Sequence, residues 1–221
     1  MPPVTRIVAI RHGETAWNVD TRIQGHRDIP LNATGRWQAQ RTARALIDEG
    51  ISAIYSSDLL RALETAQALG RALAMPVVTD TRLRERAFGL FEAHTFAEIE
   101  ARWPAEARRW AQREPDFAPD GGESLRQVQE RCVAAAQALA AAHAGQTIAL
   151  VAHGGVMDCL YRAATQLDLQ AKRSWPLGNA SINRLLHNGV GLTLIGWSDT
   201  RHLDDATALD DWTDAAGVSQ A

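Results

Sequence analysis

Short apolar runs alternate along the chain with longer stretches of helical periodicity, and this alternation limits the folds open to it. Strands are predicted at residues 4–10, 51–57, 76–80 and 146–153. Helices are predicted at residues 34–49, 58–73, 124–143 and 154–166, with Thr34 and either Ser57 or Asp58 as N-caps of the first two. Because strands that alternate with helices build a mostly parallel sheet, the sequence predicts an α/β fold, a three-layer sandwich with helices on both faces of the sheet.

The chain closes with a hairpin and an acidic segment. Residues 180–188 and 191–197 are strand-like, and Asn188-Gly189 between them has the chemistry of a tight hairpin turn. This hairpin predicts one antiparallel edge strand in the sheet. Residues 198–221 carry six aspartates, and we expect them to form a solvated acidic C-terminal tail.

The segment between the third and fourth strands is expected to form a cap. Residues 94–113 look helical with a break at Pro104, and a loop rich in Pro and Gly follows them. We expect residues 86–123 to be a small helical cap insertion over the candidate site within a single domain of residues 1–221. Its helices either pack on the core or form an apolar lid with the side chains of Phe96, Ile99, Trp103 and Trp110.

Composition excludes several classes of protein. With 23 basic and 26 acidic residues the formal net charge is −3, which argues against a nucleic-acid binder. No apolar run is long enough to cross a membrane or to be a signal-peptide core, so a soluble cytoplasmic protein is expected. Cys132 and Cys159 are expected to be reduced thiols, with a disulfide between them left open. The oligomeric state stays open: Trp37, Trp175 or Trp212, if exposed, would either mark the interface of a homodimer or be the single apolar residues that are normal on a surface.

Basic side chains follow three of the predicted strands. The first strand is followed by Arg11 and His12, Arg61 lies in the first turn of the helix after the second, and the strand 146–153 ends in His153. Ligands bind beyond the carboxyl ends of the strands in an open parallel sheet, so these groups are expected to converge there. Two guanidiniums, two imidazoles and the helix N-termini would form a cationic pocket that suits a dianionic phosphoryl group.

A metal site is the chemical alternative, because His12, His153, Glu14 and Glu85 are all potential ligands. The chain has no HExxH motif, no paired aspartates of the DxD type and no clustered thiolates. Two arginines lining the same pocket would also repel a divalent cation. It has no GxxxxGK[ST] loop for a nucleoside triphosphate either. We therefore expect no metal and no cofactor.

Five short segments carry a resemblance to a known family. They are RHGET at Arg11–Thr15, SSDLLRALETA at Ser56–Ala66, RLRE at Arg82–Glu85, GGES at Gly121–Ser124 and VAHGG at Val151–Gly155. In this order they resemble the histidine phosphatase superfamily, in the branch that contains cofactor-dependent phosphoglycerate mutases and their phosphatase relatives. The resemblance extends over residues 4–212, and it implies an enzyme acting on phosphate esters.

The resemblance assigns roles to the basic groups. His12 is expected to be the nucleophile, because attack of an imidazole nitrogen on phosphorus gives a phosphohistidine and splits the transfer into two steps. Arg11, Arg61 and His153 are expected to hold the phosphoryl oxygens and to stabilise charge during transfer. These four residues, together with an acid, form the expected catalytic set.

Further residues are expected to complete the phosphate-binding pocket. By resemblance these are Asn18 and the Gln24-Gly25 loop. Gly154 follows His153 as Gly13 follows His12, and a glycine at each position lets the backbone approach a ligand closely.

Glu85 occupies the position at which family members carry the general acid. It would protonate the leaving oxygen and later activate water. The alternative is a surface carboxylate paired with Arg82, Arg84 or Arg86. Glu14 is a second carboxylate near the expected site, and we expect it to orient other groups rather than to donate a proton.

The residues after Glu85 favour hydrolysis over isomerisation. Where the glycolytic mutases carry Arg-His-Tyr after the acid, this chain has Arg86-Ala87-Phe88, which removes groups that would help to hold a glycerate carboxylate. We therefore expect a metal-independent phosphomonoesterase that acts on small-molecule phosphate esters and releases inorganic phosphate. The alternatives are a cofactor-dependent phosphoglycerate mutase and a non-catalytic anion-binding module on the same fold.

Overall fold

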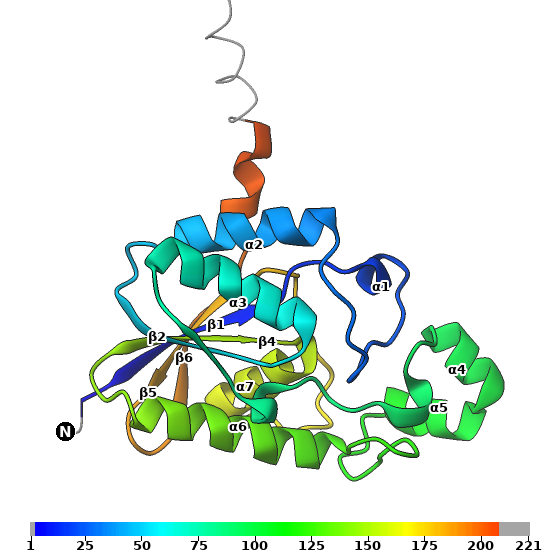
Figure 1. Ribbon diagram of the computed structural model, residues 1–221. Helices are drawn as coiled ribbons and strands as arrows, with labels where there is room; N and C mark the ends of the chain where they lie inside the picture. Colours follow the sequence, from blue (N-terminus) through cyan, green and yellow to red (C-terminus); the bar gives the residue numbers. More distant parts are fainter. Residues whose placement is uncertain (1–2, 208–221) are drawn as a thin grey trace, which may run out of the picture.

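Two neighbouring parallel strands, β1 (Thr5–Arg11) and β4 (Thr147–Ala152), lie at the centre of the sheet in the computed structural model, which describes residues 3–207 (Figure 1). The sheet has six strands in the order β3-β2-β4-β1-β5-β6. The four others are β2 (Ile51–Ser56), β3 (Val77–Thr79), β5 (Ile182–His187) and β6 (Leu192–Asp199). Strands β1 to β4 pair in parallel, whereas β5 pairs antiparallel with both β1 and β6. The prediction of a mostly parallel sheet with an antiparallel hairpin at one edge is confirmed.

Helices cover both faces of the sheet, as predicted (Figure 1). The α-helices are α1 (Ala16–Val19), α2 (Ala33–Ala45), α3 (Leu60–Leu73), α4 (Phe96–Arg102), α5 (Pro104–Ala111), α6 (Leu125–Ala141) and α7 (Gly154–Thr165). Three short 3₁₀ helices are η1 (Thr81–Leu83), η2 (Gly89–Phe91) and η3 (Arg201–Thr207). One face carries α2 and α3, and the other carries α6 and α7.

The strand period of two divides the core into two clusters. On β1, Ile7 and Ala9 pack in the cluster beneath α6 and α7, whereas Val8 and Ile10 pack in the cluster beneath α2 and α3. All six residues of β4 are buried. A central strand covered on both faces needs such a continuous apolar run, which is why these segments read as strands in the sequence.

The segment between η2 and α6 forms the expected pair of helices, separated at Pro104, which occupies the first turn of α5. These helices have a small core of their own, formed by Phe91, Ile99, Ala107 and Phe117. The side chain of Phe96 is exposed. In Figure 1, α4 and α5 lie at the end of the sheet to which β1 points, beside α1.

The helix caps differ from the sequence prediction. Asn32, not Thr34, caps α2, and its Oδ1 accepts a 2.7 Å hydrogen bond from the Gly35 amide. Helix α3 begins after Leu59 without a side-chain cap of its own. Asp28 serves instead from a distant loop, since its carboxylate accepts a 2.6 Å hydrogen bond from the Leu60 amide. Such a tertiary contact leaves no local signal in the sequence.

The first residues of the segment predicted as an acidic tail belong to the fold. Ser198 and Asp199 belong to β6, and η3 then packs on α2, where the Arg41 guanidinium donates a 2.8 Å hydrogen bond to the His202 carbonyl. The last three aspartates of the segment lie outside the described residues.

The tryptophans expected to mark a dimer interface are not all exposed. Trp175 is only 7% exposed and stacks on Tyr161 with ring centroids 3.9 Å apart, so it offers no exposed ring for an interface. Trp37 is half-buried, and Trp212 lies outside the described residues.

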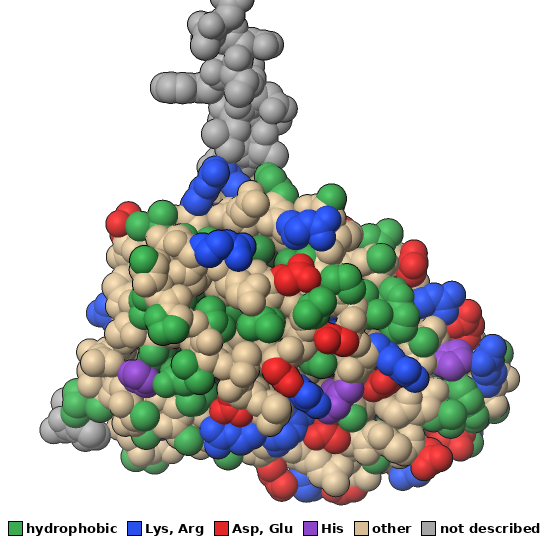
Figure 2. All heavy atoms as spheres, viewed as in Figure 1, with side chains coloured by type: hydrophobic (Ala, Val, Ile, Leu, Met, Phe, Trp, Pro, Cys, Tyr) green, Lys and Arg blue, Asp and Glu red, His purple; other side chains and the backbone are tan. Residues whose placement is uncertain are grey.

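Three further features of the described chain concern its charged surface, the length of its helices and its two cysteines. Basic and acidic side chains are interspersed on the face shown in Figure 2. Among residues 3–207, no helix has the length and apolar character needed to cross a bilayer. Cys132 on α6 and Cys159 on α7 are both buried and free.

The two candidate caps of α2 can be compared directly. Asn32→Ala removes an acceptor for a helix amide and should lower the free energy of unfolding by about 1 kcal/mol, whereas Thr34→Ala should change it by less than about 0.5 kcal/mol. Urea denaturation monitored by circular dichroism measures both. A larger loss for Thr34→Ala than for Asn32→Ala would contradict the assignment of the cap.

Candidate functional site

The pairing of β1 with β4 brings two histidines together. Arg11 lies opposite Ala152 in the parallel register, and the His12 amide donates a 2.9 Å hydrogen bond to the Ala152 carbonyl. The next residue on each strand is a histidine, and the ring centroids of His12 and His153 are 5.2 Å apart. Both side chains are buried. Convergence at the carboxyl ends of the strands is therefore a direct result of strand register.

Arg61 reaches the site from α3, the helix that follows β2 along the chain. Strand β2 lies beside β4, and Arg61 lies in the first turn of α3 that follows β2. The residue is 1% exposed, and its guanidinium donates hydrogen bonds of 2.9 and 2.8 Å to the carbonyls of Arg27 and Gly25. Burial lowers the pKa of Arg61 to about 10, with Glu85 opposing the shift, so the group stays charged at neutral pH.

The hydrogen bond of His12 selects one imidazole nitrogen for chemistry. Nδ1 lies 2.7 Å from the Gly13 carbonyl, which can only accept, so Nδ1 carries the proton and Nε2 carries the lone pair. Burial, followed by the charges of Arg61 and Arg11, holds the pKa of His12 well below its usual value. The imidazole is therefore neutral at neutral pH and has a free lone pair.

His153 and Arg11 present unpaired polar atoms to the same site. Both ring nitrogens of His153 and the Nε of Arg11 are buried without a hydrogen-bond partner. Burial lowers the pKa of His153 well below its usual value, and the Arg61 charge acts in the same direction. Buried polar groups are nearly always paired in native structures, so these atoms indicate a bound polar ligand. Arg11 is held at its other end by the Leu177 carbonyl.

Asn18 and the loop before Arg61 close the pocket. A cavity of about 180 Å³ is lined by residues that include Arg11, His12, Asn18, Gln24, Gly25, Arg61 and Glu85. Asn18 Oδ1 accepts hydrogen bonds from the Thr15 amide and from Asn179 Nδ2, which leaves the Asn18 amide nitrogen available as a donor. Gly25 has φ of +52°, and a Cβ there would strike the Glu92 carboxylate.

Glu85 lies at the N-terminus of α7 beside the basic groups. Its carboxylate oxygens accept hydrogen bonds of 3.1 and 3.0 Å from the Gly155 amide, and one of them accepts a 2.8 Å bond from the Arg86 amide. A Cβ at position 155 would overlap this carboxylate, so a larger residue there would displace the acid from its present position. The free N–H groups of the helix end fix the acid in place.

None of the three neighbouring arginines pairs with Glu85 in the described part of the chain. Arg82 binds Asp80 and Arg84 binds Asp58. Arg86 instead donates hydrogen bonds to two backbone carbonyls, those of Glu123 and Phe117. The alternative of a surface carboxylate paired with one of these arginines does not describe Glu85.

Arg131 of α6 holds the backbone on which Glu85 lies. Its Nη1 donates to the carbonyls of Arg82 and Arg84 at 2.8 and 3.0 Å, and its Nη2 donates to the Glu85 carbonyl at 3.3 Å. The Glu123 carboxylate accepts two further hydrogen bonds from the same guanidinium, at 2.9 and 2.8 Å. One side chain thus binds three backbone carbonyls of the segment that ends in Glu85.

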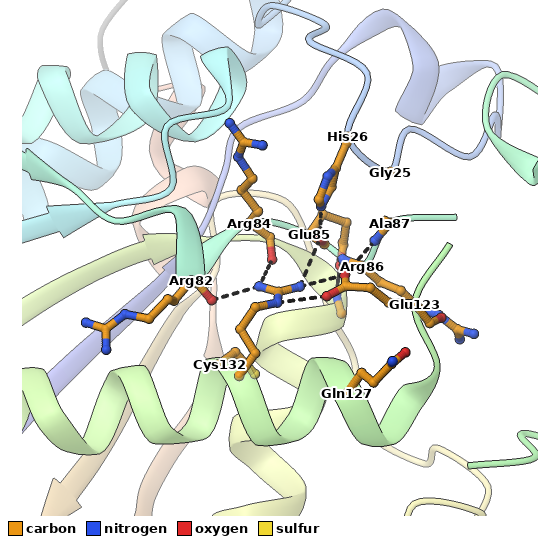
Figure 3. Close-up of polar contacts among 12 residues, drawn as sticks. Gly25, His26, Arg82, Arg84, Glu85, Arg86, Ala87, Glu123, Gln127 and Cys132 are labelled. Carbon is orange, nitrogen blue, oxygen red and sulfur yellow. Dashed lines mark hydrogen bonds and ion pairs between the residues drawn. The ribbon is translucent and has the colours of Figure 1, made fainter. Parts of the chain in front are cut away.

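His26 and Asn179 are further supports that the sequence did not single out. His26 Nε2 donates a 2.8 Å hydrogen bond to the Glu85 carbonyl, so that carbonyl is held from two sides (Figure 3). Asn179 Nδ2 donates to the carbonyls of His12 and Gly13. Asn179 lies within residues 4–212, over which the sequence resembles the histidine phosphatases, but no pattern in the sequence indicates which backbone carbonyls it binds.

Three expected residues do not line the cavity around His12. His153 is fully buried behind it, with its ring 5.2 Å from that of His12. The Glu14 carboxylate accepts a 2.7 Å hydrogen bond from Asn32 and faces α2, so it does not line the cavity. Gly154 lines an adjacent pocket, and a Cβ there would contact Arg11 Nε at 3.5 Å. Within residues 3–207, no group of three or more His, Cys, Asp or Glu side chains is placed to hold a metal ion.

The arrangement agrees with that of a known family. A family model described as the histidine phosphatase superfamily, branch 1, matches residues 7–200. The chain belongs to this superfamily. It is 40% identical over 207 residues to phosphoglycerate mutase-like protein 4 of Arabidopsis thaliana, an alignment that covers 92% of this chain and 89% of the relative. This similarity supports the phosphoglycerate mutase-like branch.

Solved structures of histidine phosphatase relatives share the fold. YhfR of Bacillus stearothermophilus superposes with a TM-score of 0.84 and is 34% identical, over 90% of this chain and 99% of that one. A mycobacterial glucosyl-3-phosphoglycerate phosphatase in complex with VO3 has a TM-score of 0.78 and 36% identity, over 88% and 99% of the two chains. Together these similarities support a phosphatase- or mutase-type activity.

The buried neutral imidazoles predict an acid-sensitive fold. Below pH 6.5 the unfolded chain takes up protons on His12 and His153, while the folded protein does not until the pH reaches their lowered pKa values. The unfolded state then binds more protons, so the free energy of unfolding falls with decreasing pH. The loss is about 1.4 kcal/mol per histidine for each unit by which folding lowers the pKa of that histidine. Urea denaturation from pH 7.5 to 5 measures this.

His12→Gln and His153→Gln should each remove part of that dependence, because Gln does not titrate. His143→Gln, a matched change at a histidine that pairs with Tyr55 and Gln146, is the control. A wild-type pH dependence in both site variants would contradict the assignment.

Proposed function

We propose that the protein is a metal-independent phosphomonoesterase that hydrolyses small-molecule phosphate esters through a phosphohistidine on His12. The single observation that carries this proposal is the buried imidazole of His12, with its lone pair on Nε2, in a cavity that it shares with Arg11 and Arg61. The two guanidiniums supply the positive charge that a metal ion supplies in other phosphatases.

In the first step His12 Nε2 attacks the phosphorus, and the bond to the ester oxygen breaks in line with it. Arg11 and Arg61 bind the phosphoryl oxygens, with Asn18 and His153 as further donors. Both arginines are anchored on backbone carbonyls, so they need no reorganisation when charge develops. The product of this step is a phosphorylated His12.

Glu85 transfers the protons. It donates one to the leaving oxygen, and in the second step the resulting carboxylate takes one from the water that attacks phosphohistidine. Its position in the cavity beside Arg11 and Arg61 supports this role. The result of the two steps is an alcohol, inorganic phosphate and the original enzyme.

Phe88 favours hydrolysis over isomerisation. Its ring lines the cavity at the place where the resemblance leads one to expect a hydroxyl-bearing tyrosine in a mutase. The glucosyl-3-phosphoglycerate phosphatase among the structural relatives supports the same choice, whereas the name of the Arabidopsis relative supports a mutase. Both activities begin with the same phosphohistidine, so the products decide between them.

Product analysis with 3-phosphoglycerate tests the proposal. With a metal chelator present, the protein should release inorganic phosphate, because water attacks the intermediate. His12→Ala should lower this release by more than about 10³-fold, since the nucleophile is lost, whereas His143→Ala should retain it. Formation of the 2-isomer without inorganic phosphate would show a mutase, and loss of activity in the chelator would contradict metal independence.

The supporting role of Arg131 gives a second test. Arg131→Met should displace Glu85 and lower kcat/KM for an alkyl phosphate by about 10²-fold, because an alkoxide needs a proton in order to leave. An aryl phosphate with a good leaving group should lose much less. Arg126→Met, an exposed arginine of the same helix that pairs with Asp116, is the matched control. Equal losses for both esters would show that Arg131 does not act through the acid.

A further inference from the structure

The loop that follows His12 packs directly on the first turns of α2. A Cβ on Gly13 would overlap the Gly35 carbonyl oxygen, and a Cβ on Gly35 would overlap the Glu14 carbonyl oxygen. The Glu14 carbonyl also accepts a 3.0 Å hydrogen bond from the Asn32 amide. The backbone after His12 is therefore in contact with the backbone of a helix on the neighbouring layer.

The glycine at position 13 permits this close packing, but it also leaves the backbone free to turn. A residue without a Cβ takes up many φ and ψ values, so the peptide unit that joins Gly13 to Glu14 can rotate at little cost. The carbonyl of this unit accepts the hydrogen bond of His12 Nδ1. Rotation of the unit would remove that acceptor, so the loop needs contacts that hold its orientation.

Gln38 supplies such a contact from α2. It lies on the same face of the helix as Asn32 and Gly35, because residues three apart are neighbours on a helix surface. Its Oε1 accepts a 2.8 Å hydrogen bond from the Glu14 amide. The Glu14 N–H and the Gly13 carbonyl belong to one planar peptide unit, so a contact that fixes the N–H also fixes the direction of the carbonyl.

Two further side chains hold other groups of this loop. Thr65 of α3 is 2% exposed, and its Oγ1 accepts a 3.1 Å hydrogen bond from the Gly13 amide. Asn179 donates a 3.3 Å hydrogen bond to the Gly13 carbonyl. Among residues 3–207, however, Gln38 provides the only acceptor for the Glu14 amide. Removal of its Oε1 would therefore leave this peptide unit without its anchor on α2.

We propose that Gln38 is a positioning residue, which holds the Gly13 carbonyl on His12 Nδ1 and thereby keeps the lone pair on Nε2, the nitrogen that attacks phosphorus. The inference rests on the proposed phosphatase function and adds to it a residue that does not line the cavity. A neutral imidazole can carry its proton on either nitrogen, and the partner of one nitrogen decides which. Hydrogen bonds in series, from Gln38 through the peptide unit to the ring, also polarise one another.

Gln38→Met is the informative variant, because methionine keeps the length of the side chain and removes the acceptor. Gln40→Met, at an exposed glutamine of the same helix, is the matched control. The first readout is the tautomer of His12, from the NMR shifts of its ring nitrogens near neutral pH, with His12→Gln to assign the signals. We expect the proton on Nδ1 in the wild-type protein and in Gln40→Met, and a mixture of both tautomers in Gln38→Met.

The second readout is kinetic. Gln38→Met should lower kcat/KM by about 10²-fold, because a nucleophile that is turned away from its target loses that much. The loss should be equal for aryl and alkyl phosphates, since both need the same imidazole, which separates it from the effect predicted for Arg131→Met. The inhibition constant of inorganic phosphate should not change, because Arg11 and Arg61 keep their anchors on backbone carbonyls.

Three results would overturn the inference. They are a wild-type His12 with its proton on Nε2, an unchanged tautomer in Gln38→Met, and a kinetic loss confined to alkyl esters or to phosphate binding. If Gln38→Met does not fold, Gln38→Leu, which also lacks the acceptor, replaces it. Hydrogen exchange of the Glu14 amide then adds a test on the wild-type protein, where slow exchange supports the inference and exchange as fast as in an open loop overturns it.

Failure of the proposed function is a separate outcome. If the wild-type protein hydrolyses no phosphate ester, the proposed function fails. The nitrogen shifts of His12 in the wild-type protein and in Gln38→Met still decide whether Gln38 holds the imidazole, because that measurement needs no turnover.

Discussion

The hydrogen-bonded pairing of β1 with β4 is the constraint on which the candidate site depends. It sets Arg11 opposite Ala152, so that the residues that follow, His12 and His153, leave the sheet side by side. A slip of one residue would turn the buried side chains of either strand to the opposite face. Because β4 is buried along its whole length, the core holds this register. Packing of the hydrophobic core thus fixes the relative positions of His12 and His153.

The electrostatics of the site follow from this burial. Arg61 keeps its charge because backbone carbonyls and Glu85 compensate the loss of water around it. The two imidazoles stay neutral because burial and the arginine charges outweigh the one hydrogen bond of His12 to the Gly13 carbonyl, which leaves His12 with a lone pair. A dianionic phosphoryl group would supply the charge that the pocket lacks. Positive groups that repel one another in the free protein then become a stabilising set of donors.

The sequence was sufficient for features that depend on local pattern. Apolar runs ending in His12 and His153 predicted two strand ends and a shared edge, and the structure places them there. Supports that act across the fold could not be predicted in this way. Arg131 of α6 binds the backbone of Glu85, which lies 46 residues away along the chain. Helical periodicity alone would place this arginine on the solvent-facing side of α6. Asp28 at the start of α3 is missed for the same reason.

In the proposed reaction His12 accepts the phosphoryl group, and mapping the site of the covalent intermediate tests this role most directly. The Glu85→Gln variant, in which hydrolysis of the intermediate is slowed, would be mixed with an aryl phosphate, quenched in alkali and digested for mass spectrometry. The account predicts a phosphoryl group on the peptide that contains His12, at its imidazole. A phosphoryl group on His153 or another side chain, with His12 unmodified, would contradict it.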